Sequence, residues 1–429
     1  MNIRVQGGQV LSGTVNISGY KNSAVCLIPS SILFDKPVTF SNIPDISDVE
    51  RLISVLKKLG SKIDYERSIG KITIDNSKLR FDELTKEDLG NMKGISLLWG
   101  PMLARFGRVV FEGLPGGCTL GFRTLTPHYR AFSDLGVKVN EDRHSARMDI
   151  SEACGREIFL REMSPTATEN VIMLAVGLKG KTKIVGAASE PQVQDLCNFL
   201  VSCGAKIKGI ASSILEVEGG SQLTPHEYKI VFDDHEVATF LAMGASTGGF
   251  VRVNGVNKWS FEPIRQTFES FGVDIKYDGD SAYVEKNQKV IIKEEEGRGY
   301  LLIKPRPWPG LMVDNLPIFI PLALSASKGQ VMFHNWMYEG GLFWVSELQK
   351  LGANVIIADP HRVIVTAGRK LYGDTLEAPY IIRAVVAMVM SSMIAEGESI
   401  ILNAESLYRG HPHFSENLQK LGAKIEEIS

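Results

Sequence analysis

The sequence predicts an α/β protein built from six similar subdomains that are shared between two domains. Three observations lead to this prediction: the length of 429 residues, a short motif that recurs six times, and the elements expected on either side of that motif. A chain of this length exceeds what one compact core usually holds, so two or more domains are expected.

The recurring motif is Leu, Cys or Phe, then Gly, a small residue, a charged or polar residue, and Ile or Val. Its copies, roughly 70 residues apart, centre on Gly60, Gly136, Gly204, Gly272, Gly352 and Gly422. Apolar residues recur at helical spacing before each Gly, as in 49–59 and 193–201, and two alternating segments follow, as in 207–217 and 355–365. Gly adopts the left-handed conformation after a helix at little cost, so each copy predicts helix, Gly, strand, turn, strand. Units longer than solenoid repeats indicate small subdomains, three in each of two similar domains.

Composition and charge are those of an ordinary soluble protein. Hydrophobic residues make up 44% and charged residues 22%, and the net charge of −2 gives no basic field for nucleic acid. The N-terminal residues 1–18 alternate like a strand and lack the pattern of a signal peptide. The longest apolar run, residues 384–395, is too short to span a bilayer. We therefore expect a cytoplasmic protein without membrane or nucleic-acid partners.

The five cysteines include one in an unusual setting. An odd number without CxxC pairs indicates neither a disulfide framework nor a zinc site, and four of the five lie in patterns typical of a core. The fifth, Cys118, lies in the glycine-dense segment 113–123, which ends at Arg123. No Lys-Ser/Thr pair follows, so this is not a P-loop. A nearby Arg would favour the thiolate, although a cysteine is also often a small buried hydrophobe.

A second notable segment is Gly19-Tyr20-Lys21-Asn22-Ser23, which precedes an apolar helix expected over residues 23–33. A Lys at a helix start is disfavoured by the helix dipole unless an anion lies there too. Lys21 therefore indicates either an anion site or an ordinary solvated surface lysine.

These segments and the repeats resemble the enolpyruvyl transferase family from end to end, most closely its branch that uses UDP-N-acetylglucosamine as acceptor. The resemblance implies two inside-out α/β barrel domains, each of three repeated subdomains. It implies a first domain over residues 21–231, carrying the cysteine loop, and a second over 1–20 and 232–429. The active site would lie in the cleft between them, and such clefts are common ligand sites.

The resemblance also implies roles on the phosphoenolpyruvate side. Cys118 would act as the general acid at C3 and could form a covalent adduct. Lys21 would bind phosphoenolpyruvate, and Arg123 and Arg409 would neutralise its charge. Asp314, in the segment 309–314, would be the base near the acceptor hydroxyl.

On the acceptor side the resemblance places Asn22, Ser164, Thr166 and Arg383 near the second substrate. Ser164 and Thr166 belong to a segment that lies along the acceptor nucleotide, and its Ser is also typical of a helix N-cap. Arg383, at the head of an apolar helix, could otherwise be a surface residue whose stem packs on apolar neighbours.

Departures from the family pattern gather on this acceptor side. Lys93 replaces an Arg, which keeps the charge and loses the bidentate fork. The remaining departures are the Thr124–His128 segment without its Asp, Glu162 in place of a basic residue, the Gly340-Gly341 pair, and Ile381 in place of an Asp.

The resemblance implies transfer of the enolpyruvyl group of phosphoenolpyruvate to a hydroxyl of UDP-N-acetylglucosamine, with release of phosphate, in peptidoglycan precursor synthesis. The alternatives are transfer to another nucleotide such as UMP in nucleoside-antibiotic biosynthesis, and a binding protein that has lost catalysis. No metal or organic cofactor is required. The partners are phosphoenolpyruvate and a nucleotide-type acceptor, and we expect a monomer or a weak homo-oligomer.

The first prediction concerns the reactivity of Cys118. Because its loop is rich in Gly and ends at Arg123, we expect Cys118 to be the most readily alkylated thiol. Fosfomycin, an epoxide mimic of phosphoenolpyruvate, should modify it. Peptide mapping after treatment checks this, and labelling at Cys26 or Cys203 with Cys118 untouched would refute the assignment.

Overall fold

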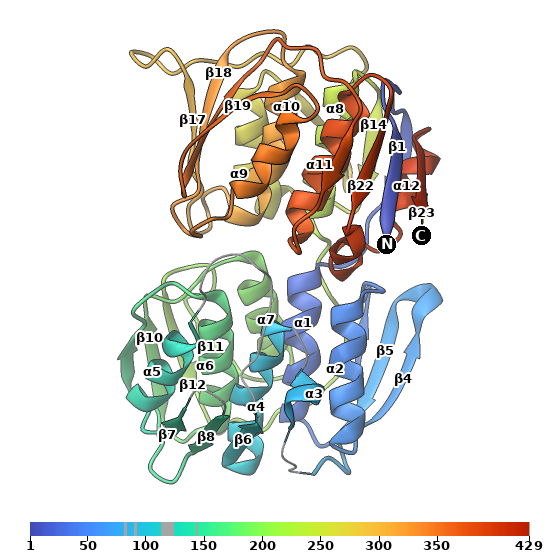
Figure 1. Ribbon diagram of the computed structural model, residues 1–429. Coiled ribbons are helices and arrows are strands. Elements are labelled where there is room, and N and C mark those ends of the chain that lie inside the picture. The colour runs from blue at the N-terminus through green and yellow to red at the C-terminus, as the bar shows by residue number, and fades with distance from the viewer. Residues whose placement is uncertain (81–83, 90–91, 113–123, 143–144, 429) are drawn as a thin grey trace. The chain divides into compact units, whose positions relative to one another are not determined.

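The computed structural model describes residues 1–80, 84–89, 92–112, 124–142 and 145–428, which form two compact units (Figure 1). The inserted unit consists of the described residues from Gly19 to Val231. The terminal unit combines Met1–Ser18 with the residues from Phe232 onward. In each unit helices lie at the centre and small sheets lie around them, which is the inside-out arrangement.

The described strands of the inserted unit form three sheets with one shared pairing pattern. In the order of neighbours across the sheet, the first and second strands are parallel. The second and third strands are antiparallel, and so are the third and fourth. The first sheet contains β13 (Glu227–Lys229), β3 (Val38–Ser41), β5 (Lys71–Asp75) and β4 (Lys62–Glu66). The third contains β9 (Glu157–Phe159), β10 (Lys181–Val185), β12 (Ile214–Glu218) and β11 (Lys206–Lys208). The second contains β6 (Arg108–Glu112), β8 (Ser145–Asp149) and β7 (Lys138–Glu141), and a parallel bridge from Leu84 to Phe111 takes the place of the first strand.

The terminal unit repeats the pattern in three further sheets. One sheet contains β2 (Gly13–Asn16), β14 (Val251–Asn254), β16 (Ser281–Val284) and β15 (Ile275–Asp278). The next contains β17 (Leu301–Ile303), β18 (Gln330–His334), β20 (Arg362–Thr366) and β19 (Asn354–Asp359). The last contains β21 (Thr375–Glu377), β22 (Glu398–Leu402), β1 (Asn2–Gln6) and β23 (Lys424–Ile428). Strand β1 lies between β22 and β23, so both ends of the described chain belong to one sheet.

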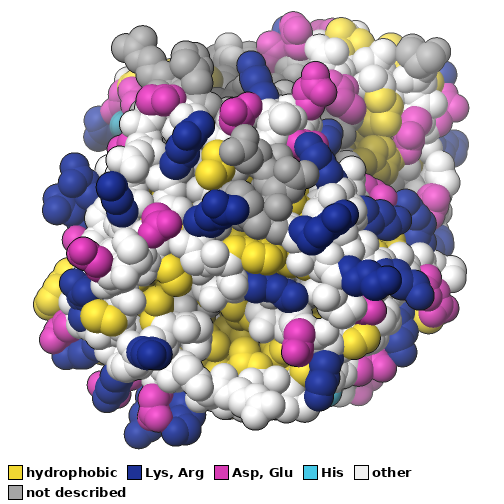
Figure 2. Space-filling view, turned by 90° about the horizontal axis from the view of Figure 1, so that it is seen from below, with side chains coloured by type: hydrophobic (Ala, Val, Ile, Leu, Met, Phe, Trp, Pro, Cys, Tyr) yellow, Lys and Arg dark blue, Asp and Glu magenta, His cyan; other side chains and the backbone are white. Residues whose placement is uncertain are grey.

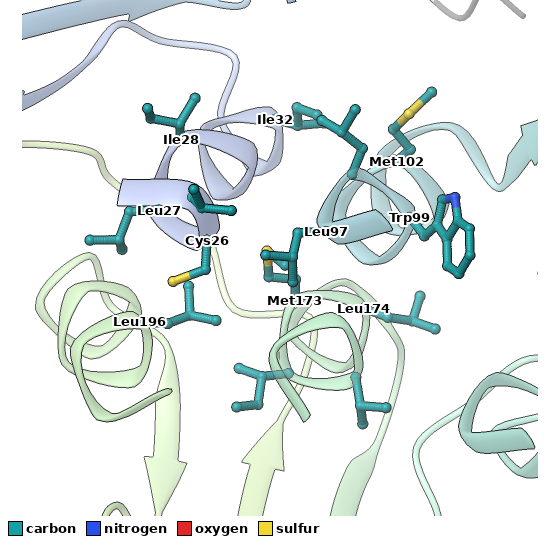
Figure 3. Packing of buried hydrophobic residues seen from close by; sticks show 14 of the residues in the cluster. Cys26, Leu27, Ile28, Ile32, Leu97, Trp99, Met102, Met173, Leu174 and Leu196 are labelled. Carbon is teal, nitrogen blue, oxygen red and sulfur yellow. The ribbon is translucent and has the colours of Figure 1, made fainter. Parts of the chain in front are cut away.

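A buried helix precedes the second strand of every sheet. These helices are α1 (Lys21–Ser30), α4 (Trp99–Phe106), α6 (Pro165–Gly177), α8 (Asp234–Thr247), α10 (Phe319–Ser325) and α11 (Ile382–Ile394). The 3₁₀ helices η3 (Lys93–Leu98) and η4 (Val313–Ile318) lead into α4 and α10. Figure 3 shows Cys26 beside Leu196, and Leu97 beside Met173, in the core of the inserted unit. A helix that is apolar all round must be buried on all sides, and this composition places these helices at the centre.

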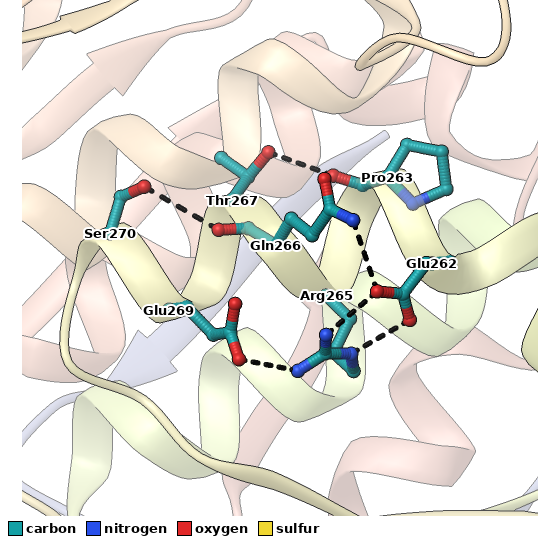
Figure 4. Close-up of polar contacts among 7 residues, drawn as sticks. All are labelled: Glu262, Pro263, Arg265, Gln266, Thr267, Glu269 and Ser270. Atoms are coloured by element: carbon teal, nitrogen blue, oxygen red, sulfur yellow. Dashed lines mark hydrogen bonds and ion pairs between the residues drawn. The ribbon is translucent and has the colours of Figure 1, made fainter.

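The outer helices keep one face in water. They are α2 (Ser47–Lys58), α5 (Thr126–Asp134), α7 (Pro191–Ser202), α9 (Lys258–Ser270), the 3₁₀ helix η5 (Phe343–Gln349) and α12 (Phe414–Lys420). On α9, Arg265 bonds Glu262 at 2.7 Å and Glu269 at 2.6 Å (Figure 4). Such exposed pairs contribute only about 0.3–0.5 kcal/mol each. The remaining short elements are η1 (Ser31–Leu33), η2 (Arg67–Ile69), α3 (Lys86–Leu89) and η6 (Ala404–Arg409).

Every outer helix ends at one of the six repeat glycines, and the predicted conformation is confirmed. The φ angles of these glycines lie between +69° and +107°. The Gly204 N–H donates to the Val201 carbonyl and the Ala205 N–H to the Leu200 carbonyl, both at 2.9 Å. All six sites repeat this pair of bonds, which is the Schellman motif. The motif turns the chain from each outer helix into the next strand.

The surface mixes charges of both signs. On the face shown in Figure 2, Lys and Arg side chains are spread widely, with Asp and Glu among them. Within the described part of the chain, no helix combines the length and the apolar character needed to cross a membrane.

The second prediction concerns Gly422, where φ is +92° and an added Cβ would meet no atom within 4 Å. Substitution there tests backbone conformation alone. We expect Gly422→Ala to lower the free energy of unfolding by about 1–2 kcal/mol, Gly422→Val by more, and Gly422→Asn by less, because Asn tolerates this conformation. Urea unfolding checks the order, and equal losses for Asn and Val would contradict it.

Candidate active site

The predicted site residues gather at the starts of the buried helices. Lys21 opens α1, Lys93 opens η3, and Ser164 is the N-cap of α6. In the terminal unit, Asp314 lies in the first turn of η4 and Arg383 in the first turn of α11. The first N–H groups of a helix have no partner within it, and the helix dipole adds positive potential there. These ends therefore suit anionic ligands.

Lys21 is paired within the protein. Its Nζ lies 2.8 Å from Asp48 Oδ2, and both side chains are largely buried, at 13% and 8% exposure. Asp48 comes from the first turn of α2, and no sequence pattern indicates it. One anion beside Lys21 is therefore the carboxylate of Asp48, and the alternative of a solvated surface lysine is wrong. The neighbouring Asn22 donates from Nδ2 to the Tyr20 hydroxyl at 3.4 Å.

Around α6, the acceptor-side residues surround a histidine. The Ser164 hydroxyl accepts the Ala167 N–H at 3.4 Å, which confirms the N-cap prediction. Thr166 Oγ1 lies 3.1 Å from Nε2 of His128, a residue of α5 that is almost completely buried. Burial, followed by the charge of Lys93, lowers the pKa of His128 to about 3. The structure thus brings Lys93, Ser164, Thr166 and His128 together in the inserted unit.

In the terminal unit, Arg383 belongs to a buried chain of polar contacts. Its Nη1 donates to His411 Nε2, and His411 Nδ1 lies 3.5 Å from Glu236 Oε1. Glu236 Oε2 accepts the N–H of Ser18 at 3.0 Å and its hydroxyl at 2.9 Å. Since Arg cannot accept a hydrogen bond, His411 Nε2 must be unprotonated, and its proton is on Nδ1 facing Glu236. The chain therefore connects Arg383 to the segment that follows β2.

Glu236 is held in an environment that disfavours its charge. Burial, and then the nearby Asp233, raise the pKa of Glu236 to about 8, and the Ser18 hydrogen bonds and Arg383 oppose this shift. Asp233 caps α8 and accepts the backbone N–H groups of His235 and Glu236.

Asp314 and Arg409 lie nearer to solvent. The Asp314 carboxylate is 41% exposed, and its Oδ2 lies 3.9 Å from Nε2 of the buried His235. His235 Nδ1 lies 2.6 Å from Asn315 Oδ1. Burial and then Arg383 lower the pKa of His235, so a neutral imidazole faces the predicted base. The Arg409 guanidinium stacks over the Tyr380 ring, 5.2 Å from its centroid.

Several functional candidates are not visible in the sequence. His235, Glu236 and His411 join through contacts between residues far apart in the chain, so no local pattern indicates them. The sequence indicates His128 only as part of a segment that departs from the family. Cys118 and Arg123 lie outside the described residues.

The remaining cysteines differ in reactivity. Burial raises the pKa of Cys26, of Cys197 to about 12, and of Cys203 to about 11. Such thiols are inert. The expectation that Cys154 belongs to a core is wrong, because it is exposed in the turn between β8 and β9, where the Arg156 guanidinium donates to its sulfur at 3.2 Å. A Cys154→Ser background is therefore the control for labelling of Cys118.

Comparison with known families agrees with this architecture. The model of the family EPSP synthase (3-phosphoshikimate 1-carboxyvinyltransferase) matches residues 5–418. The chain belongs to this enolpyruvyl transferase family. It is accordingly a transferase.

Curated relatives match the chain along its whole length. Proteins named UDP-N-acetylglucosamine 1-carboxyvinyltransferase are 35% identical in Borreliella burgdorferi, over 99% of this chain and 98% of that protein, and 36% identical in Treponema denticola, over 98% of each. The relative of that name in Bacteroides thetaiotaomicron is 35% identical over 99% of both chains.

Solved structures of family members share the fold. The enolpyruvyl transferase NikO from Streptomyces tendae aligns with a TM-score of 0.88 at 20% identity, over 100% of this chain and 98% of that one. An EPSP synthase from Acinetobacter baumannii aligns with a TM-score of 0.74 at 15% identity, over 99% of this chain and 100% of the other.

The third prediction concerns Glu236 and pH. Between about pH 4.5 and 8 the folded state retains a proton that the unfolded state has released, so the stability contributed by Glu236 falls as pH rises. Glu236→Gln cannot titrate, so we expect its free energy of unfolding to improve relative to the wild type from pH 5 to pH 8. Urea unfolding at several pH values measures the difference.

The matched control is Glu339→Gln, which changes an exposed glutamate of the same unit. It measures the effect of removing a carboxylate from the surface of that unit. A Glu236→Gln difference that, after subtraction of the Glu339→Gln difference, does not change with pH or moves in the opposite direction would refute the raised pKa of Glu236.

Proposed function

We propose that this chain transfers the enolpyruvyl group of phosphoenolpyruvate to a hydroxyl of UDP-N-acetylglucosamine and releases phosphate. The observation that carries the proposal is the identity of 35–36% to enzymes of that name over 98–99% of both chains. The cationic side chains and helix starts of the two units support it, since both substrates are anionic.

The proposed reaction is an addition followed by an elimination. The acceptor oxygen forms a bond to C2 of phosphoenolpyruvate as its proton passes to Asp314, and C3 receives a proton from Cys118. The C2–O bond to phosphate then breaks, C3 loses a proton, and the vinyl ether remains on the acceptor. A positioned acid or base typically contributes about 10²–10⁴ in rate.

Charge stabilisation is assigned to the basic residues. Lys21, Arg123 and Arg409 would bind the phosphate and carboxylate of phosphoenolpyruvate, and such contacts strengthen when water is excluded. We assign the acceptor to Asn22, Lys93, Ser164, Thr166 and Arg383. The pairing of Lys21 with Asp48 supports its role, because it holds the ammonium group in place before substrate arrives.

Part of the departure from the family pattern has a local cause. Gly340 has φ +69°, and an added Cβ would lie 3.3 Å from the Phe343 ring, so this backbone favours Gly there. Two further features bear on the ligand: Pro165 provides no backbone N–H at the start of α6, and both ring nitrogens of His128 already have protein partners. UMP is the second candidate acceptor, because the acceptor side departs from the family pattern at positions such as Lys93, Glu162 and Gly341.

The test of the proposal is an assay that detects both phosphate and the carboxyvinyl product. Wild-type protein with phosphoenolpyruvate and UDP-N-acetylglucosamine should form the two in equal amounts, and Cys118→Ala should slow turnover by about 10²–10⁴. A binding protein without catalysis would form neither.

The fourth prediction concerns acceptor affinity. Each buried polar group of a ligand that has no hydrogen-bond partner costs about 1–3 kcal/mol. If two groups of UDP-N-acetylglucosamine are unpaired in this site, its KM should be about a hundredfold above that of an enzyme that pairs both, or the chain should prefer UMP. Steady-state phosphate release with each acceptor measures this. Tight, rapid turnover of UDP-N-acetylglucosamine would show that other residues of the chain bind these groups.

A further inference from the structure

Both nitrogens of His128 are engaged in one buried chain of hydrogen bonds. Nε2 lies 3.1 Å from Thr166 Oγ1, and Nδ1 lies 3.1 Å from Asn170 Nδ2. The ring is 2% exposed and meets Trp99 edge to face at 5.6 Å. Its position is therefore fixed from three sides.

The protonation of His128 follows from its partner Asn170. Asn170 Oδ1 accepts the Gly100 N–H at 2.7 Å, which orients the amide so that Nδ2 faces His128. The carbonyl oxygens of Ser96 and Thr166 lie 3.1 and 3.2 Å from the same Nδ2, so its two protons are shared among three acceptors. An amide NH₂ cannot accept a hydrogen bond, so His128 Nδ1 must be unprotonated. The neutral imidazole then has its proton on Nε2 and donates it to Thr166 Oγ1.

This donation decides what the Thr166 hydroxyl can do. A hydroxyl has one proton to give, and His128 is already donating to its oxygen, so the Thr166 proton must point toward a different acceptor. Within the described residues near α6, the Ser164 hydroxyl lies at 3.5 Å, at the limit of a hydrogen bond. Thr166 is partly exposed, as is Ser164, whereas His128 is buried.

We propose that His128 is a positioning residue for the acceptor substrate, turning the Thr166 hydroxyl so that it donates to a phosphoryl oxygen of the acceptor nucleotide. The inference rests on the proposed function, which places Ser164 and Thr166 beside that nucleotide. A phosphoryl oxygen fits because it only accepts hydrogen bonds and because the start of α6 favours negative charge. Because Pro165 has no backbone N–H to donate at the start of α6, the Thr166 hydroxyl contributes more of the hydrogen bonding to the phosphoryl group.

The fifth prediction is a double-mutant cycle on acceptor binding. Isothermal titration calorimetry with UDP-N-acetylglucosamine, and separately with UMP, compares the wild type with Thr166→Val, His128→Asn and the double variant. Asn at 128 retains an acceptor for Asn170 and loses the N–H toward Thr166. We expect Kd to rise about tenfold in each single variant and about tenfold, not a hundredfold, in the double variant. Because His128 acts through Thr166, the second substitution should add little.

Conservative variants and a control separate positioning from folding. His128→Gln, which retains an N–H toward Thr166, and Thr166→Ser should both bind nearly as tightly as the wild type. Thr182→Val makes the same Thr-to-Val change at a buried hydroxyl of β10 for which the described residues provide no partner, and it should not alter Kd. The KM for phosphoenolpyruvate should stay unchanged throughout.

Additive losses in the double variant, or unchanged binding in His128→Asn beside weakened binding in Thr166→Val, would overturn the inference. If His128→Asn fails to fold, weak binding by His128→Gln would overturn it too. If the Kd changes of the two single variants are not additive but the wild type forms no product, only the proposed function is refuted. If the wild type forms product but the Kd changes are additive, only the inference is refuted. Wild-type protein that binds neither nucleotide would refute both.

Discussion

The architecture depends on one constraint, which is that the central helices are buried along their sides. Helices such as α6, α8 and α11 are packed against apolar neighbours over almost their whole length. A polar group on the side of a buried helix needs partners within the protein, as Asn170 of α6 has in Gly100 and His128, so the groups left to meet a ligand lie at the helix ends. At the N-terminal ends the free N–H groups and the dipole select anions. This explains why the candidate site residues lie in the first turns of successive repeats.

A second consequence concerns charge at these ends. In each unit a partly or fully buried cation lies beside a carboxylate or a neutral histidine. In the inserted unit Lys21 pairs with Asp48, and Lys93 lies near His128. In the terminal unit Arg383 contacts His411. A cation in such a place needs a partner, since a buried unpaired charge is costly. Neutral histidines supply directed hydrogen bonds without adding charge beside the cations. Substrate anions would then be bound by cations whose positions are already fixed.

The sequence predicted the repeating part of the fold because that part is local. Gly136 and Gly352 take the positive φ that the motif required, and the paired strands after each glycine lie where the alternation placed them. The helix starts at Lys21 and Ser164 were likewise visible in short segments. The contacts that build the candidate site join distant positions, as in the bonds from Ser18 to Glu236 and from Arg383 to His411, and no local pattern encodes them. For Cys154 the local pattern was misleading, because the sequence around it is typical of a core and the residue lies in an exposed turn.

The central claim is that the chain forms a carboxyvinyl ether through a tetrahedral intermediate in which C3 is briefly a methyl group. Turnover of phosphoenolpyruvate with UDP-N-acetylglucosamine in heavy water, followed by mass spectrometry of the product, tests this most directly. A methyl group formed with solvent deuterium can lose either isotope, so the account predicts an acceptor that carries one carboxyvinyl group with deuterium at C3. A carboxyvinyl product without deuterium, or phosphate release without that product, would contradict it.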